Sequence, residues 1–292
     1  MNMNAAHEFY YRMPHRTGGL RPGSHRGSSH GAGQEFVSHM SLYDRPDPRR
    51  LDLRASLRNV RHDWLIHISR QRVSVPVHVV VDVSASMAFG AFRPKLHLAA
   101  DFVEVLGRST FRAGDKLGMV AFDAHERLEL FVPARLNRGI GEVMSALLRQ
   151  FEADPAGGGP AGNVGGLESA VTHVTGRPGM VFLVSDFHFP LESLRGTLDS
   201  LVHMFVVPMV VWDTAEIDPP DTNAIAALRD AESGVRRTLL TRPKLRDQWR
   251  GAVARRREVL DQFFAGWSMR TFYLTEPFDS DAMSQYFFEV TA

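Results

Sequence analysis

The stretch VPVHVVVDVSASM at residues 75–87 decides the fold. Residues 75–83 are apolar at almost every position, so both faces of this strand must be covered by other parts of the chain. A strand of that kind is typical of a parallel sheet with helices above and below it. Asp82, Ser84 and Ser86 would then lie at the carboxyl edge of the sheet, where open α/β sheets bind their ligands.

The same pattern continues toward the C-terminus, where short β-branched runs alternate with segments of helical length. Only residues 123–126 separate two of the apolar runs, which favours an antiparallel hairpin. We therefore expect an α/β fold with a doubly wound, mostly parallel sheet and one antiparallel edge strand. The expected strands are 75–83, 116–122, 127–133, 179–187, 204–212, 237–240 and 269–274, and the expected helices are 92–111, 137–151, 167–175, 191–203, 245–264 and 280–288.

The first 75 residues differ from the rest of the chain in charge, because they hold 12 arginines and no lysine against 6 acidic residues. Arginine forms fixed, bidentate pairs with carboxylates, so we expect this basic segment to contact protein, either its own chain or a partner, rather than nucleic acid. We interpret residues 1–72 as an extended N-terminal segment, in which the Gly-, Ser- and His-rich stretch 17–33 is flexible. Residues 73–292 would form the α/β domain, with a C-terminal helical extension.

The composition excludes several classes of protein. Because the chain has no cysteine, it has no disulfide framework, no thiol nucleophile and no thiolate metal site. No apolar run approaches the ~18 residues needed to span a bilayer, and the first residues lack the apolar centre of a secretory signal. We therefore expect a cytoplasmic protein without a transmembrane segment.

Four oxygen-bearing side chains follow the buried strands. Asp82, Ser84 and Ser86 come directly after the first strand, and Asp186 ends a later one that can lie beside the first in a doubly wound sheet. Ligand sets made only of oxygen suit Mg²⁺, Mn²⁺ or Ca²⁺ and suit zinc or copper poorly. One hypothesis is a divalent cation site, and the other is that these side chains only cap backbone groups.

The pattern Asp-x-Ser-x-Ser at residues 82–86, with Ser-Asp ending a later strand, resembles the metal-ion-dependent adhesion site of von Willebrand factor A domains. That family is non-enzymatic, and its cation accepts a carboxylate from a partner protein. The resemblance implies that Ser84 and Ser86 bind the metal directly, whereas Asp82 and Asp186 bind it directly or through water. It also implies that no residue is catalytic.

The second metal loop departs from the family's pattern. The family supplies a threonine there in a G-G-T-x-L context, whereas this chain reads GNVGGL at residues 162–167. Gly165 falls at the threonine position, which removes one direct ligand. Asn163 or a water molecule would have to take its place, and a site without a replacement would be vestigial.

Nearly the full chain also resembles a bacterial family catalogued as domain of unknown function 58 (DUF58). The family's G-x-G-x-E-F stretch reads GAGQEF at residues 31–36, and its R-x-I-D-W-like stretch reads RLDL at residues 50–53, with Leu53 in place of tryptophan. Members, including MxaS-type accessory proteins, are commonly encoded beside MoxR-type AAA+ ATPases and are associated with the maturation of other proteins, such as methanol dehydrogenase. The resemblance therefore implies an ATPase partner and a client protein.

Other motif matches fail on their context. The GGGPAG stretch at residues 157–162 fits a dinucleotide-binding pattern, but it follows a helix instead of a strand. The GSSHG stretch at residues 27–31 fits a hydrolase elbow, but it lies in the N-terminal segment. The run Arg255–Arg257 indicates a solvated helix face. The irregular spacing of four N-terminal histidines favours solvated or Asp-paired side chains over metal ligands: these are His15, His25, His30 and His39.

Together with the residues at the sheet edge, the two resemblances imply a non-enzymatic protein-interaction module that works with a MoxR-type AAA+ ATPase through a divalent cation. Two alternatives stay open. In the first, Asp82 and Asp186 hold Mg²⁺ and activate water for hydrolysis, with His188 close by. In the second, the chain is a structural scaffold whose metal site is vestigial.

Overall fold

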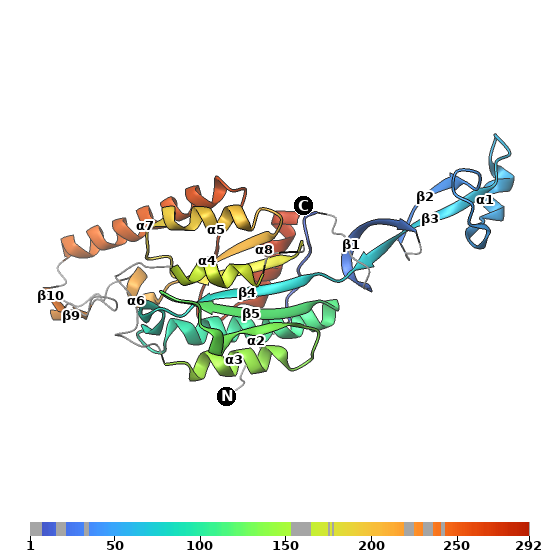
Figure 1. The fold of residues 1–292 in the computed structure, drawn as a ribbon. Coiled ribbons are helices and arrows are strands. Elements are labelled where there is room, and N and C mark those ends of the chain that lie inside the picture. Colours follow the sequence, from blue (N-terminus) through green and yellow to red (C-terminus); the bar gives the residue numbers. More distant parts are fainter. Residues whose placement is uncertain are drawn as a thin grey trace, which may run out of the picture.

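The main body of the molecule is a six-stranded sheet between two layers of helices (Figure 1). The computed structural model describes residues 8–15, 22–31, 35–152, 165–174, 176, 178–218, 225–229, 236–240 and 243–291. The strands, in the order in which they pair, are β11 (Phe272–Leu274), β8 (Phe205–Val211), β7 (Met180–Ser185), β4 (Pro76–Asp82), β5 (Lys116–Phe122) and β6 (Val132–Arg135). Only the edge pair β5–β6 is antiparallel within this sheet, so the expected α/β class with one antiparallel edge strand is confirmed.

Helices cover both faces of this sheet, as the apolar β4 requires. Successive residues of β4 alternate between two hydrophobic cores: Val79 and Val81 enter one, and Val80 enters the other. The first core is closed by α2 (Lys95–Ala113), α3 (Ile140–Gln150) and α8 (Ser280–Thr291). The second is closed by α4 (Gly165–Thr172), α5 (Arg195–Ser200) and α7 (Pro243–Ala265).

The structure differs from the expected elements at two places in this domain. The strand expected at 127–133 begins only at Val132, because Leu128–Leu130 form a 3-10 turn, η3. The second difference is β9 (Ile225–Arg229), for which no strand was expected, whereas the strand expected at 269–274 is present as β11 and pairs with β8 in the main sheet. Shorter elements are η2 (Ala85–Ala88), η4 (Leu191–Leu194), α6 (Thr214–Ile217) and a hairpin of β9 (Ile225–Arg229) and β10 (Arg236–Leu240). In the described part of the chain, no helix is both long and apolar enough to cross a membrane.

The N-terminal arm is a second, three-stranded antiparallel sheet that projects from the main body (Figure 1). It consists of β1 (Pro22–Gly31), β2 (Glu35–Ser41) and β3 (Leu65–Val73), with η1 (Pro48–Arg50) and α1 (Leu53–Arg58) at its tip. Residues 22–31, expected to belong to a flexible stretch, thus form a strand because β3 supplies backbone partners for them. The rest of that stretch, residues 17–21 and 32–33, lies outside the described residues.

The beginning of the described chain packs into the main domain instead of the arm. Phe9 is fully buried, and its ring stacks on Phe102 of α2 and on Phe287 of α8 at centroid distances of 6.2 and 6.3 Å. The residues before the arm are therefore part of the first hydrophobic core.

A buried carboxylate joins the arm to the main body. One oxygen of Asp115, Oδ2, accepts hydrogen bonds from the Tyr11 hydroxyl and from His25 Nε2, each at 2.6 Å. The Met13 amide donates to His25 Nδ1, so Nε2 carries the proton. The other oxygen, Oδ1, accepts the Val75 amide at 2.8 Å, just before β4 begins. Burial and the Asp115 charge raise the pKa of Tyr11, which keeps its hydroxyl protonated as a donor.

Replacing Asp115 should therefore loosen the arm at its root. Asp115→Ala leaves three buried donors without an acceptor, and we expect it to lower the free energy of unfolding by about 3 kcal/mol or more. Urea denaturation followed by circular dichroism measures the change. The exposed Asp199→Ala is the matched control and should stay within about 0.5 kcal/mol of wild type. Equal stability of the two variants would contradict the assigned role of Asp115.

Candidate functional site

The parallel pairing of β4 with β7 brings the predicted metal ligands to one edge of the sheet. Val81 of β4 pairs with Val184 of β7, so Asp82 and Ser185 end the two strands side by side. The Ser185 hydroxyl donates to Asp82 Oδ2 at 2.6 Å. Asp186 follows Ser185 directly, and both aspartates are buried.

The loop after β4 folds its two serines around Asp82. The Ser84 amide donates to Asp82 Oδ1 at 2.9 Å, which turns the chain back toward the strand end. The hydroxyls of Ser84 and Ser86 lie 3.1 Å apart, within hydrogen-bond distance. Ser84 precedes the 3-10 turn η2 and Ser86 lies within it, and the fully buried Met87 of the same turn anchors the loop in the first core. The structure therefore brings together Asp82, both serines and Asp186.

A lysine that the sequence analysis did not select completes this cluster. Lys95, the first residue of α2, is buried, and its Nζ lies 2.7 Å from Asp186 Oδ2. The same ammonium donates to Glu216 Oε1 of α6 at 2.8 Å. His188 contributes its backbone amide to Asp186 Oδ1 at 3.2 Å, and its ring nitrogen Nε2 lies 3.8 Å from Glu216 Oε1.

The two aspartates differ in their electrostatic environment. Burial, together with the nearby charge of Asp186, raises the pKa of Asp82 to about 6. Hydrogen bonds from Ser185 and Ser84 lower this pKa, but their effect is smaller. Burial would also raise the pKa of Asp186, but the charges of Lys95 and His188 and the hydrogen bonds from Lys95 and Ser86 together outweigh it, so that pKa is lowered. The Lys95 pKa is raised, because Asp186 and Glu216 outweigh the effect of its burial. Near neutral pH, Asp82 is therefore the carboxylate whose charge is compensated less well.

The loop that follows Asp186 is held in an uncommon conformation. Phe187 has a φ of 52°, a left-handed value that is uncommon for a residue with a side chain. Its buried ring packs against Phe264 of α7. Arg256, also on α7, donates to the carbonyls of Phe187 and Phe189. Arg256 was expected on a solvated helix face, but it is half-buried and ties α7 to this loop.

A cavity of about 580 Å³ lies next to this cluster, between the strand ends and α7. Its wall combines aromatic and aliphatic side chains with Glu216, His188 and Arg256, three residues that also contact the Asp186 loop or Lys95. Trp249 of α7 donates to the Glu216 carbonyl at 2.7 Å, which fixes one side of the cavity.

The second metal loop contributes less to the described site. Gly165, which stands where a threonine was expected from the resemblance, is the first residue of α4, and Asn163 lies outside the described residues. The glycine at the neighbouring position 166 is required by packing, because a Cβ there would lie 2.2 Å from the His125 carbonyl group. The start of α4 can therefore approach the loop after β5 only with glycine at that position.

The family assignment rests on most of the chain and not on the site alone. The family model described as protein of unknown function DUF58 matches residues 46–259. This chain belongs to the DUF58 family. It is 30% identical over 243 residues to an uncharacterized protein of Mycobacterium bovis, and the match covers 82% of this DUF58 chain and 74% of the mycobacterial protein.

The comparison with solved structures found partial similarities. An aerotolerance-related membrane protein of Bacteroides fragilis matches 75% of this DUF58 chain and 98% of its own, with 14% identity and a TM-score of 0.44. A von Willebrand factor type A protein of Catenulispora acidiphila matches 77% of this chain and 43% of its own, with 13% identity and a TM-score of 0.40. The sheet topology of this chain itself agrees with the expected doubly wound, mostly parallel sheet with one antiparallel edge strand.

The raised pKa of Asp82 predicts a pH dependence of stability in chelator. The folded protein holds this proton more tightly than the unfolded chain, so the stabilising contribution is present at low pH and is lost as the pH rises through about 6. Between pH 5 and pH 7.5, wild type should lose about 1 kcal/mol of unfolding free energy relative to Asp82→Asn, which cannot ionise. Urea titrations of both proteins in EDTA measure this difference, and parallel pH profiles would disprove it.

Proposed function

We propose that this DUF58 protein is a non-enzymatic protein-interaction module that holds its partner through a divalent cation. The observation that carries the proposal is the buried pair Asp82 and Asp186 beside the Ser84 and Ser86 hydroxyls at the carboxyl edge of the sheet. Open α/β sheets bind their ligands at this edge. The position therefore supports a binding site rather than a purely structural cluster.

The donor set fits a hard cation. Two carboxylates and two hydroxyls offer only oxygen, which suits Mg²⁺, Mn²⁺ or Ca²⁺. The raised pKa of Asp82 supports this fit, because a buried carboxylate of that kind gains from a nearby positive charge. When bound, a cation would supply that charge and an open coordination position for a carboxylate of the partner. Asp82, Ser84, Ser86 and Asp186 would hold it.

The resemblance to the family suggests the partner, a MoxR-type AAA+ ATPase that acts on a further client protein. An acidic side chain of the ATPase would complete the coordination and would be held by charge-assisted contacts. The cavity beside Glu216 and Trp249 would receive apolar side chains that flank this acidic group, because its wall is largely aromatic and aliphatic.

A second candidate function, a scaffold without metal, is supported by Lys95. Its ammonium lies between Asp186 and Glu216, at 2.7 and 2.8 Å. It therefore already supplies Asp186 with the positive charge that a metal ion would supply in an adhesion-type site. The glycine at position 165, which offers no side-chain ligand, supports the same alternative. In this case the fold would mediate the contact with the ATPase, and Mg²⁺ would have no effect.

A binding assay separates the two functions. Purified wild type, Asp82→Ala and the exposed-site control Asp199→Ala are immobilised and exposed to the MoxR-type ATPase of the same genome, in Mg²⁺ or in EDTA. We expect the wild type and the control to bind only in Mg²⁺, and Asp82→Ala to bind at least about tenfold more weakly, since it loses a charge-assisted contact. Equal binding by all proteins in EDTA would instead establish the scaffold.

Lys95 offers an independent test that needs no partner. Lys95→Met leaves Asp186 and Glu216 without their shared cation, so in EDTA we expect a loss of about 3 kcal/mol or more of unfolding free energy. Mg²⁺ should restore part of this loss, because a divalent cation can compensate Asp82 and Asp186 together. The exposed pair of Arg195 with Glu192 provides the control, and Arg195→Met should cost at most about 1 kcal/mol in either buffer. A loss that Mg²⁺ does not reduce would argue against a cation site.

A further inference from the structure

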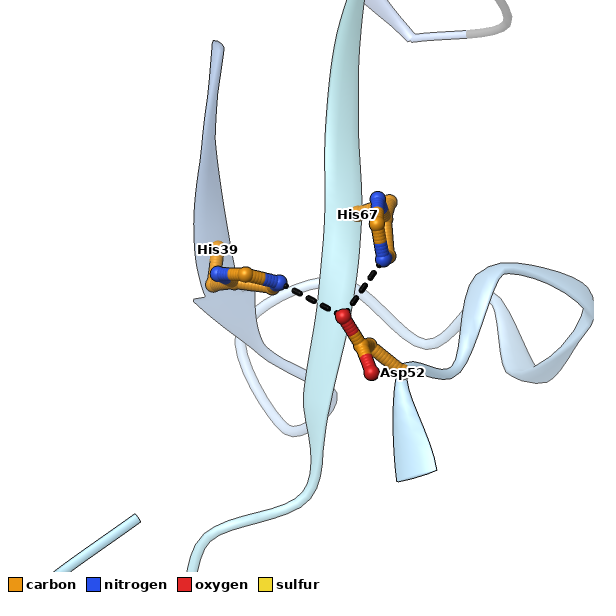
Figure 2. Close-up of side chains that lie close together, drawn as sticks. All are labelled: His39, Asp52 and His67. Carbon is orange, nitrogen blue, oxygen red and sulfur yellow. Dashed lines mark hydrogen bonds and ion pairs between the residues drawn. The ribbon is translucent and has the colours of Figure 1, made fainter. Parts of the chain in front are cut away.

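A second cluster of potential metal ligands lies on the arm, far along the chain from Asp186. His39 of β2 and His67 of β3 are directly paired across the two antiparallel strands, so their side chains lie on the same face. Asp52 precedes α1 as its N-cap and faces the same two rings. Figure 2 shows both imidazoles directed at the Asp52 carboxylate.

The three side chains converge on one point. Asp52 Oδ2 lies 2.9 Å from His39 Nε2 and 2.6 Å from His67 Nε2. The three candidate ligand atoms all lie within 4.8 Å of one another. The remaining oxygen, Oδ1, accepts the Ala55 amide at 2.9 Å and caps α1, which leaves Oδ2 free to face the histidines. Because its two oxygens have different partners, the Asp52 carboxylate is held in one orientation.

We propose that His39, Asp52 and His67 form a binding site for a divalent transition metal ion such as Zn²⁺. Two imidazole nitrogens and one carboxylate oxygen form a ligand set that suits zinc and leaves one coordination position open. Mg²⁺ and Ca²⁺ prefer oxygen ligands, so the arm site and the carboxyl-edge site would select different cations. A water molecule or a partner side chain would take the open position.

The geometry needs only a small adjustment to accept the ion. Ligand atoms about 2.0–2.2 Å from a tetrahedral zinc lie roughly 3.3 Å apart, somewhat farther than the two hydrogen-bonded distances. The His67 side chain is 47% exposed and the His39 side chain is 31% exposed, so both rings have room to move. The neutral rings would carry their proton on Nδ1 and coordinate through Nε2.

The ionisation of Asp52 supports the same site. The Ala55 amide and the histidine contacts lower the pKa of this carboxyl group well below its usual range, so it is negatively charged at neutral pH. A metal ion would replace the protons that now lie between Oδ2 and the rings. It would also connect the start of α1 to β2 and β3, and thereby fix the tip of the arm to its sheet.

Zinc titration of the full chain tests the proposal. The protein is first treated with chelator, and ZnCl₂ is then titrated by calorimetry in buffer with excess MgCl₂. We expect a zinc site in wild type that is weakened at least about tenfold in His39→Gln, His67→Gln and Asp52→Asn. Asparagine also caps helices well, so Asp52→Asn keeps α1 and tests coordination alone. The exposed His203→Gln is the control and should bind zinc as wild type does.

A second measurement locates the bound ion. Zinc should slow amide hydrogen exchange in α1 of wild type and should have no such effect in His67→Gln. In Asp82→Ala, zinc should still slow amide hydrogen exchange in α1. The test of the arm site is therefore independent of the proposed function at Asp82. Absence of zinc binding by wild type, or unchanged binding in both histidine variants, would overturn the proposal.

Discussion

The parallel pairing of β4 with β7 is the interaction on which the rest of the site depends. It fixes where the two strands end and so places Asp82 beside Ser185, with Asp186 one residue further along. Helices on both faces bury these strands, which removes water from around the carboxylates. The same burial that stabilises the sheet, together with the nearby charge of Asp186, therefore raises the pKa of Asp82.

Much of this arrangement could be predicted from the sequence, because it follows from local patterns. The largely apolar run of β4 indicated a central parallel strand, and the two aspartates stand at strand ends that the sequence marks: Asp82 is the last residue of β4 and Asp186 directly follows β7. Lys95 and Glu216 could not be predicted in the same way. They lie 121 residues apart in the chain and meet only because α2 and α6 begin at the same edge of the sheet.

The arm was predicted less well for a related reason. Gly, Ser and His residues have little apolar surface to bury, so their composition alone indicates a flexible stretch. The backbone of residues 22–31 nevertheless pairs with β3, and His25 finds the buried Asp115 of the main domain. His39 was expected to be solvated or paired with aspartate, and the structure pairs it with Asp52. The contact of His67 with Asp52 could not be predicted, because it depends on the register of β2 and β3, which places His67 opposite His39.

The direct continuation of β3 into β4 has a mechanical consequence. Only Ser74 and Val75 separate the two strands, and the Val75 amide is held by Asp115 at this junction. Residues 65–82 therefore form one nearly unbroken extended path, with a contour length of about 60 Å at roughly 3.3 Å per residue. The arm leaves from the amino end of β4 (Figure 1), whereas Asp82 is the last residue of β4 and so lies at its carboxyl end. The central strand thus acts as a spacer that keeps the arm and the Asp82 end of the sheet apart.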